Sequence, residues 1–366
     1  MEWPMVLREL HLHGGSRILS GGDPKTTLRP NMVSNRSLEI KLKSFGSLYS
    51  DVKKLGLNII GCDFYTTDDE VNGFNPPQWR SRNVAANPSW LCNDQCNEWS
   101  FIANAAFKQS KGLLYDIASR IAHQLRACEW RLRQLSEVYE QQLNSRLREK
   151  PFLPDKQFLD GYTSLCYLAL QSFLVDACVL RDYLSEFYYE TIIKTVDHEA
   201  NKVTTLNGLL KRWKQHPPTD PAGKELRASA QTGQWLFELG AYRDLVVHVA
   251  PLANAGRTLF AVTRTIEMPH GELLPAIKLP LPGNPADLTK ERVTGRYFQD
   301  PDLDFARFKN IIENTPDSRD SLEYAHLCMQ QLGAIASSIS KISPIPPEIP
   351  LITPKDVIGE IKFNRK

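Results

Sequence analysis

Three polar residues in the second half of the chain have side chains of the types that take part in acid–base chemistry on phosphate esters. Arg243, Asp244 and His248 lie within the stretch YRDLVVH. A guanidinium group binds phosphate through paired hydrogen bonds, and an imidazole exchanges protons near neutral pH. These residue types suit a site in which Arg243 holds a phosphate and His248 acts as general acid or base.

The spacing of these residues also predicts how they lie on a helix. Residues 225–250 carry apolar residues at steps of three and four, which is the stripe of a packed α-helix. Asp244 and His248 are four residues apart and share one face of a straight helix. Arg243 and His248 are five apart, so their side chains point about 140° away from each other. We therefore expect Asp244 to orient His248, while the long Arg243 side chain reaches a neighbouring groove.

An Arg followed by a His after four to six intervening residues also occurs elsewhere in the chain, at Arg8–His13, Arg264–His270 and Arg319–His326. These pairs lie, in turn, in a short alternating stretch, across a proline, and at a helix cap. Only the 243–248 pair combines a preceding amphipathic helix, an aromatic residue directly before the Arg and a polar residue directly after it. The context therefore favours this pair as the site.

With its helix, the motif of Arg243, Asp244 and His248 resembles the ribonuclease site of the HEPN superfamily of helical-bundle proteins. The resemblance covers roughly residues 100–345. It implies metal-independent cleavage of RNA through the ribose 2′-hydroxyl, without a cofactor. It also implies a homodimer in which two motifs face one cleft, a role as a toxin or antiviral defence effector, and a protein partner such as an antitoxin. Asp244 stands where Asn is most frequent in the family.

A non-catalytic interpretation of the same motif remains open. An Arg and an Asp followed by a His on a helix also form a solvated ion cluster, and the Asp places negative charge where a phosphate would bind. The alternative is a helical-bundle interaction module that binds a partner through the hairpin insert and the neutral N-terminal region. Exposure of Arg243 and His248 in a shared groove favours the enzyme, whereas local ion pairs favour the module.

A second basic stretch suits contact with RNA. Lys211, Arg212 and Lys214 surround Trp213 in the sequence LLKRWKQH. Cations follow the phosphate backbone of a single strand, and an aromatic ring stacks on its bases. We therefore predict RNA binding at these four residues, although the same charges also fit the solvated side of a helix.

The sequence predicts no metal site and no cofactor. Cys92 and Cys96 have three residues between them instead of the usual two, and no second pair follows. His11 and His13 can share one face of a strand, which fits either a metal site or, more commonly, exposed histidines. The sequence contains no glycine-rich phosphate loop, no GxSxG nucleophile motif and no HExxH zinc motif.

The composition is that of an ordinary globular protein, with 42% hydrophobic and 23% charged residues among 366. The net charge of +2 means that any basic surface for RNA is local. Seven scattered cysteines predict no disulfide framework and favour a reducing cytoplasm. The N-terminus has no signal-peptide pattern, and the longest apolar run, 165–180, is too short and too polar to span a membrane.

The order of elements predicts a mainly α fold in three regions. Residues 1–99 combine strand-like segments with a short helix, as a small α+β region. Residues 100–345 predict a HEPN-like antiparallel four-helix bundle with a β-hairpin insert near 257–282. Residues 346–366 predict an extended proline-rich tail.

Apolar periodicity sets the limits of the four bundle helices, which are 100–149, 156–195, 224–250 and 319–341. The first is one long helix or two collinear ones, and Asp317 or Ser318 is expected to cap the last. Prolines in the second strand of the hairpin predict that it lies at a sheet edge. Residues 71–90, which are rich in Asn and Pro, predict a loop.

Overall fold

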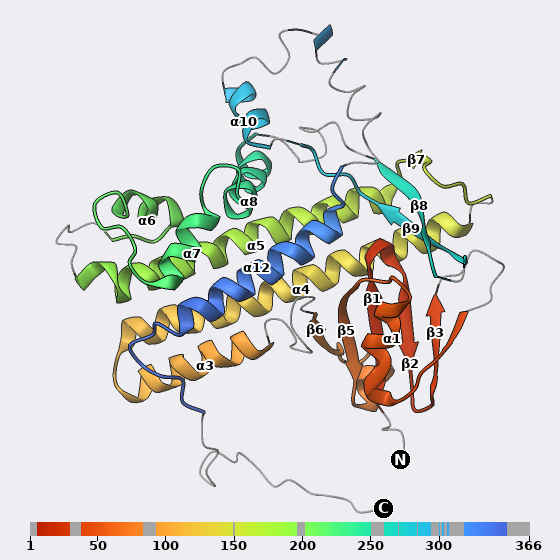
Figure 1. The fold of residues 1–366 in the computed structure, drawn as a ribbon, viewed down its shortest axis with the longest axis horizontal. Helices are drawn as coiled ribbons and strands as arrows, with labels where there is room; N and C mark the ends of the chain where they lie inside the picture. The colour runs from red at the N-terminus through yellow and green to blue at the C-terminus, as the bar shows by residue number, and fades with distance from the viewer. Residues whose placement is uncertain are drawn as a thin grey trace, which may run out of the picture.

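A computed structural model gives the arrangement of most of the chain. It describes residues 6–29, 38–82, 93–148, 151–195, 202–249, 260–269, 271–283, 285–293, 300, 302–303, 306 and 318–349. Helices make up the larger part of these ranges, and the strands form antiparallel sheets, which confirms the mainly α prediction. Figure 1 shows the long helices side by side, with the larger sheet against one end of them.

A six-stranded antiparallel sheet forms the N-terminal part, in the order β4-β3-β2-β1-β5-β6. Its strands are β1 (Leu7–Leu12), β2 (Arg17–Ser20), β3 (Lys25–Arg29), β4 (Leu38–Lys41), β5 (Ile59–Tyr65) and β6 (Gln78–Ser81). The alternating or buried apolar patterns of β1, β4 and β5 predicted those strands. The prediction of a loop over 71–90 is wrong at β6. The four residues after the two prolines form a strand that hydrogen-bonds with β5.

Short helices connect the strands of this sheet. They are η1 (His13–Gly15), η2 (Phe45–Ser47), α1 (Leu48–Lys54) and α2 (Asp68–Val71). Helix α1 covers one face of the sheet, where Leu48 and Val52 share a core with β1. The other face lies toward the helices, and Ile60 and Trp79 belong to the core of the helical part.

Four long helices form the main body: α3 (Asn93–Lys108), α4 (Gly112–Arg148), α5 (Gly161–Thr191) and α12 (Ser321–Ser340). Helices α4 and α5 form the predicted hairpin, and α12 contacts α3, α4 and α5. The prediction of collinear helices over 100–149 is wrong. Ser110 adopts a φ of 56° in the turn after α3, and the chain folds back so that α3 packs along α4.

The helix predicted over 224–250 is broken into shorter pieces. They are α7 (Pro221–Ser229), α8 (Trp235–Asp244) and the π-helical η4 (Leu245–Val249). Gly233, with a φ of 83°, lies in the turn between α7 and α8, a conformation that glycine adopts without steric cost. The predicted apolar stripe is still the inner side of α8, since Leu239 and Tyr242 are buried. Helix α6 (Leu206–Arg212) precedes α7.

The predicted β-hairpin is present as β8 (Ala261–Glu267) and β9 (Leu273–Lys278). Strand β7 (Gln157–Phe158), which comes from the connection between α4 and α5, adds a third strand. The order β7-β8-β9 leaves β9 at an edge, as its prolines predicted. Helix α10 (Pro285–Val293) follows the hairpin.

Asp320 caps α12 and joins three elements. Its Oδ1 accepts hydrogen bonds from the amides of Leu322 (2.9 Å) and Glu323 (3.0 Å). Its Oδ2 accepts from the hydroxyl of Tyr139 on α4 (3.0 Å) and from the amide of Leu279 after β9 (3.0 Å). The prediction that Asp317 or Ser318 caps this helix is wrong, because these tertiary contacts select Asp320.

Helix α5, together with η3 (Ile193–Thr195), is long and apolar enough to cross a membrane by length and composition alone. The share of its most apolar window buried inside the protein is 50%, so the same composition also fits a core helix. Cys166 and Cys178 on α5 are buried and free. Beyond α12, the amide of Glu348 donates to the carbonyl of Phe101 (3.2 Å), and residues 350–366 of the predicted tail lie outside the described residues.

Candidate functional site

The predicted catalytic residues lie at the junction of α8 and η4. Arg243 and Asp244 end α8, and His248 lies in the π-helical turn that follows. A π-helix forms hydrogen bonds between residues five apart, so each of its turns holds more residues than an α-helical turn. The side chain of His248 lies outside the described atoms, so its predicted role stays a prediction.

Arg243 forms a local ion pair. Its Nη1 donates a hydrogen bond to Oδ1 of Asp244 at 2.8 Å, and this bond raises the pKa of the guanidinium. Both side chains remain accessible, with exposed fractions of 33% for Arg243 and 49% for Asp244. We expected Arg243 to reach into a neighbouring groove, and in this arrangement it is instead turned to Asp244.

A second Arg–Asp pair lies beside the first, on α5. Nη2 of Arg181 lies 3.0 Å from Oδ1 of Asp182. The same oxygen accepts a hydrogen bond from the amide of Leu206, where α6 begins (3.1 Å). Gly240 of α8 gives Arg181 room, since a β-carbon at that position would lie 2.9 Å from Nη1 of Arg181. Sequence reasoning missed this pair, although the repeated Arg-Asp dipeptide was a signal.

Both ion pairs lie near one buried thiol between α5 and α8. Cys178 is 2% exposed, and burial is the main reason that its pKa is raised to about 11. The charges of Arg181, Asp182, Arg243 and Asp244 also influence this thiol, so both ion pairs lie near it. The guanidinium of Arg243 is the more accessible of the two, and it suits an anionic ligand such as a phosphate that displaces Asp244, because it forms charge-assisted hydrogen bonds. We call these four residues, with His248 beyond them, the α5–α8 site.

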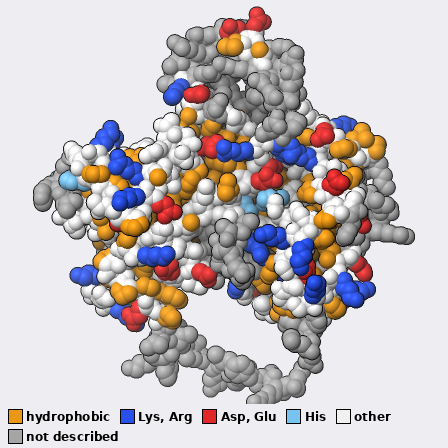
Figure 2. All heavy atoms as spheres, in the orientation of Figure 1, with side chains coloured by type: hydrophobic (Ala, Val, Ile, Leu, Met, Phe, Trp, Pro, Cys, Tyr) orange, Lys and Arg blue, Asp and Glu red, His pale blue; other side chains and the backbone are white. Residues whose placement is uncertain are grey.

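The predicted RNA-binding stretch is only partly accessible. Lys211 and Lys214 are exposed at the end of α6, and Arg212 is half-buried. Trp213 is 1% exposed, and its ring meets that of Tyr188 edge-on with centroids 5.4 Å apart. The prediction of base stacking on Trp213 is therefore wrong, because its ring belongs to the core. Basic side chains still gather over the region of α6 (Figure 2).

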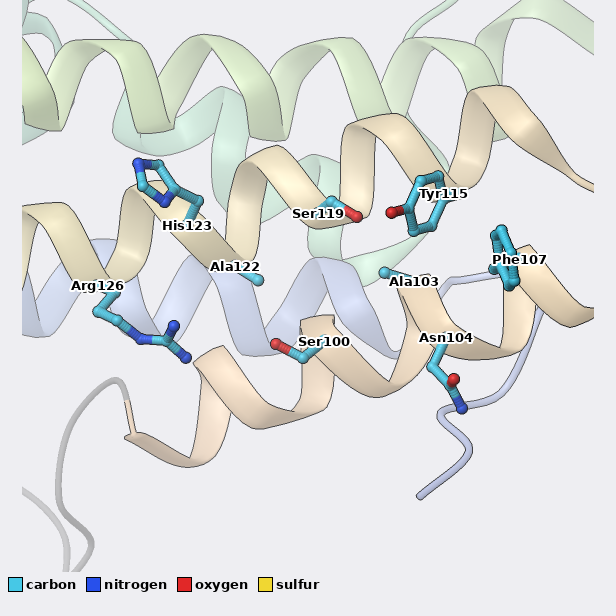
Figure 3. A pocket seen from close by; sticks show the side chains of 9 residues that line it. All are labelled: Ser100, Ala103, Asn104, Phe107, Tyr115, Ser119, Ala122, His123 and Arg126. Atoms are coloured by element: carbon cyan, nitrogen blue, oxygen red, sulfur yellow. The ribbon is translucent and has the colours of Figure 1, made fainter. Parts of the chain in front are cut away.

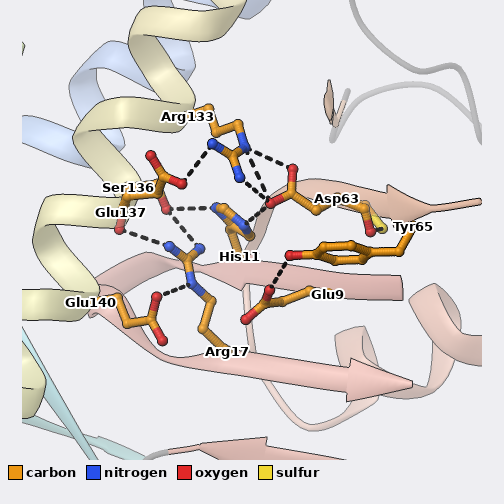
Figure 4. Close-up of polar contacts among 10 residues, drawn as sticks. Glu9, His11, Arg17, Asp63, Tyr65, Arg133, Ser136, Glu137 and Glu140 are labelled. Atoms are coloured by element: carbon orange, nitrogen blue, oxygen red, sulfur yellow. Dashed lines mark hydrogen bonds and ion pairs between the residues drawn. The ribbon is translucent and has the colours of Figure 1, made fainter. Parts of the chain in front are cut away.

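A buried polar network connects the sheet to α4 (Figure 4). His11 of β1 lies at its centre and is 1% exposed, so it is not the exposed strand histidine that the sequence favoured. Nε2 of His11 lies 3.2 Å from Oδ2 of Asp63, and Nδ1 lies 3.2 Å from Oγ of Ser136. Nη2 of Arg133 donates to Oδ2 of Asp63 at 2.8 Å. Nη1 of Arg17 donates to Oγ of Ser136 at 3.0 Å.

The partners fix the protonation of this His11 network. A carboxylate only accepts hydrogen bonds, so Nε2 of His11 donates to Asp63 and Nδ1 accepts from the hydroxyl of Ser136. Burial lowers the pKa of His11 to about 3, which keeps the ring neutral. Burial opposes ionisation of Asp63, but hydrogen bonds from His11 and Arg133 lower its pKa to about 2.

In this network a carboxylate, an imidazole and a hydroxyl are hydrogen-bonded in that order. The same order occurs where an imidazole acts as general base for a serine nucleophile. Ser136 is 0% exposed, however, and no substrate reaches a hydroxyl that is sealed between the sheet and α4. Glu9, His11 and Asp63 also present ligand atoms within 4.8 Å of one another, as a metal site would. Both nitrogens of His11 and both oxygens of Asp63 already have hydrogen-bond partners. We therefore assign the network to the docking of the sheet.

Two histidines from the other Arg–His pairs meet where η1 contacts α12. Nε2 of His13 lies 3.3 Å from Nδ1 of His326. Nε2 of His326 lies 2.8 Å from the carbonyl oxygen of Arg82, which can only accept, so Nδ1 of His326 accepts from His13. Burial lowers the pKa of His326 to about 3. His270 of the remaining pair lies outside the described residues.

Comparisons of this chain with protein-family models, with curated proteins and with solved structures found no match. The choice between the clusters therefore rests on their accessibility. The His11 network is closed to solvent, whereas Arg243 and Asp244 of the α5–α8 site are not. We take the α5–α8 site as the candidate functional site.

Proposed function

We propose that this chain is a HEPN-type endoribonuclease that cleaves RNA without a metal ion, through the ribose 2′-hydroxyl. The observation that carries the proposal is the accessible guanidinium of Arg243 at the end of α8, with the Arg181–Asp182 pair beside it and His248 in the next turn. The helix that bears this motif packs on α5 of the central hairpin, which agrees with a site on a helical bundle.

Each residue of the site has a role in this proposal. Arg243 exchanges the carboxylate of Asp244 for the scissile phosphate and offsets the charge that develops in the transition state. His248 transfers a proton to or from the 2′-hydroxyl or the leaving oxygen. The internal 2′-hydroxyl is the nucleophile, so the first product carries a 2′,3′-cyclic phosphate. Lys211 lies on α6, the helix that begins against Asp182, and Lys214 lies in the turn after it. Both are exposed and attract the strand through its phosphates.

We further propose that the protein acts in the cytoplasm as a homodimer, as a toxin or antiviral effector with a possible antitoxin partner. The resemblance of the motif to HEPN proteins is the source of this biological role. Phe237 and Val247 support an interface near the site, because these apolar side chains are 37% and 48% exposed on α8 and η4.

The experiment is a cleavage assay on total RNA with EDTA present. We expect cutting by the wild type, with cyclic phosphate ends, and a loss of about 100-fold or more in His248→Ala, since a positioned acid or base contributes that much. Arg243→Ala is expected to be similarly impaired. The matched control is Arg227→Ala, which removes an exposed cation from α7. Full activity of His248→Ala, or loss of cutting in EDTA, would rule out the mechanism.

The Arg243–Asp244 ion pair favours a second candidate, a non-catalytic interaction module of the same fold. In that case the pair is a permanent surface contact and no RNA is cut. The two proposals differ in what a purified protein does: the module binds a protein partner but leaves RNA intact at any pH and with any metal added.

A further inference from the structure

A groove of about 420 Å³ opens between α3 and α4, apart from the α5–α8 site (Figure 3). Its floor consists of small side chains from both helices: Ser100, Ala103, Ser119 and Ala122. Small residues at facing positions leave space where larger ones would fill the contact between two helices. The volume lies in the range of small-molecule sites in proteins.

One end of the groove is aromatic. Phe107 of α3 and Tyr115 of α4 lie there, with ring centroids 5.5 Å apart and planes inclined by 54°. Their exposed fractions are 67% and 42%, so most of the Phe107 ring faces solvent. Two neighbouring aromatic rings left in water offer a surface on which a flat, apolar group stacks favourably.

The opposite end is basic. Figure 3 shows His123 and Arg126 there, both exposed on α4. Among the residues that the structure describes, Arg126 has no carboxylate within ion-pair distance. Its Nη2 donates instead to Sγ of Cys96 (3.2 Å), which positions the guanidinium without neutralising it. Other arginines of α4 do pair with carboxylates, namely Arg120, Arg131 and Arg133.

We propose that this groove binds a nucleobase that carries a phosphate. The base stacks on Tyr115 and Phe107, and the phosphate lies against Arg126 and His123 at the other end. The ligand is either a free nucleotide or one nucleotide of a single RNA strand, since both present the same chemistry. The site is independent of the proposed catalytic residues, because α3 and α8 lie on opposite sides of α12 (Figure 1).

Calorimetric titration of the whole protein tests this site. The probes are AMP, adenosine, inorganic phosphate and a single-stranded RNA hexamer. We expect AMP to bind about tenfold more tightly than either half alone, since each 1.4 kcal/mol of added contact is worth that factor. A hexamer that binds while AMP does not identifies RNA as the source, whereas AMP binding as tight as the hexamer identifies a free nucleotide.

Variants at the two ends separate the contacts. Arg126→Gln should weaken AMP about tenfold and leave adenosine unchanged, because it removes only the phosphate contact. Tyr115→Ala should weaken the binding of both AMP and adenosine. Tyr115→Phe, which keeps the ring, should bind both as tightly as the wild type. Arg148→Gln removes an exposed cation from the last turn of the same helix and is the matched control. Melting temperatures of the variants verify that they are folded.

The proposal is overturned if neither AMP nor the hexamer binds at millimolar concentration. It is equally overturned if the probes bind but respond to neither Arg126→Gln nor Tyr115→Ala. These outcomes are distinct from a failure of the cleavage assay, which concerns Arg243 and His248 and leaves this groove untouched.

Discussion

At the scale of single residues, buried neutral histidines set the response of the fold to acid. His11 and His326 are both 1% exposed, and burial lowers the pKa of each to about 3. In the unfolded chain each ring takes up a proton below its ordinary pKa of about 6.5. The stability that these rings contribute is therefore present above about 6.5 and is lost progressively as the pH falls from there toward 3.

We predict that the free energy of unfolding decreases between pH 7 and pH 5. Each histidine contributes a loss of about 2 kcal/mol at pH 5, at about 1.4 kcal/mol per pH unit. Buried Asp320 offsets about 1 kcal/mol, because burial raises its pKa to about 6 and the folded state gains a proton there as the pH falls. Urea unfolding at the two pH values measures the difference.

His326→Gln should show a smaller decrease than the wild type, whereas His123→Gln, which changes an exposed ring on α4, should match the wild type. Equal wild-type stability at pH 7 and pH 5 would contradict the assignment of neutral buried rings.

The Arg243–Asp244 ion pair is a second single-residue feature with a testable effect, because it competes with the substrate of the proposed activity. Asp244→Asn removes the carboxylate that accepts the 2.8 Å hydrogen bond and leaves Arg243 free for a phosphate. We predict a several-fold increase in RNA cleavage, since the substrate no longer competes with a fixed anion. Initial rates on a short labelled RNA provide the measurement. A slower variant would mean that Asp244 takes part in catalysis through His248 instead.

At the scale of elements, the η1 turn fixes the sheet to the helices. Gly15 has a φ of 97°, and a β-carbon there would lie 2.8 Å from the carbonyl oxygen of Tyr139 on α4. The backbone of η1 therefore approaches α4 more closely than any residue with a side chain permits. This contact lies next to the His11 network, in which Ser136 belongs to the same helix.

Gly15→Ala should cost about 3 kcal/mol or more in unfolding free energy, because it combines a strained φ with a clash against backbone. Gly73→Ala is the matched control. Gly73 has a φ of 78° but nothing within 4 Å of an added β-carbon, so only about 1 kcal/mol should be lost. Urea titrations of both variants compare them. Equal losses would show that the approach to Tyr139 does not matter for stability.

At the scale of the whole molecule, the proposed composite cleft requires two copies of the chain. We predict a dimer at micromolar concentration by analytical ultracentrifugation. Val247→Ser should shift it toward monomer and weaken cleavage, because Val247 is 48% exposed one residue before His248. Phe74→Ser, at a 79% exposed ring in the N-terminal region, should leave the dimer intact. A strictly monomeric wild type would remove the shared cleft but not the fold.

The sequence by itself determined most of the elements. Apolar residues at helical spacing predicted α4, α5 and α12. Alternation predicted β1 and the first strand of the β8–β9 hairpin, and a continuous apolar run predicted β5. Local chemistry is sufficient for such elements, because the periodicity of burial follows the periodicity of the backbone. The sequence also pointed to the Arg243–Asp244–His248 motif and predicted the inner face of α8.

Only the tertiary structure decided what covers each face. The spacing of apolar residues shows that one side of a helix is buried, but it does not show which element that side packs against. Trp213 next to three cations therefore suggested a contact with RNA, and His11 on an alternating strand suggested an exposed histidine, whereas Tyr188 and Ser136 cover them. The breaks at Ser110 and Gly233 were missed for a related reason. The apolar period continues through each of these turns, so the sequence pattern does not mark the break. The break forms because the segments on either side pack against residues far away in the sequence.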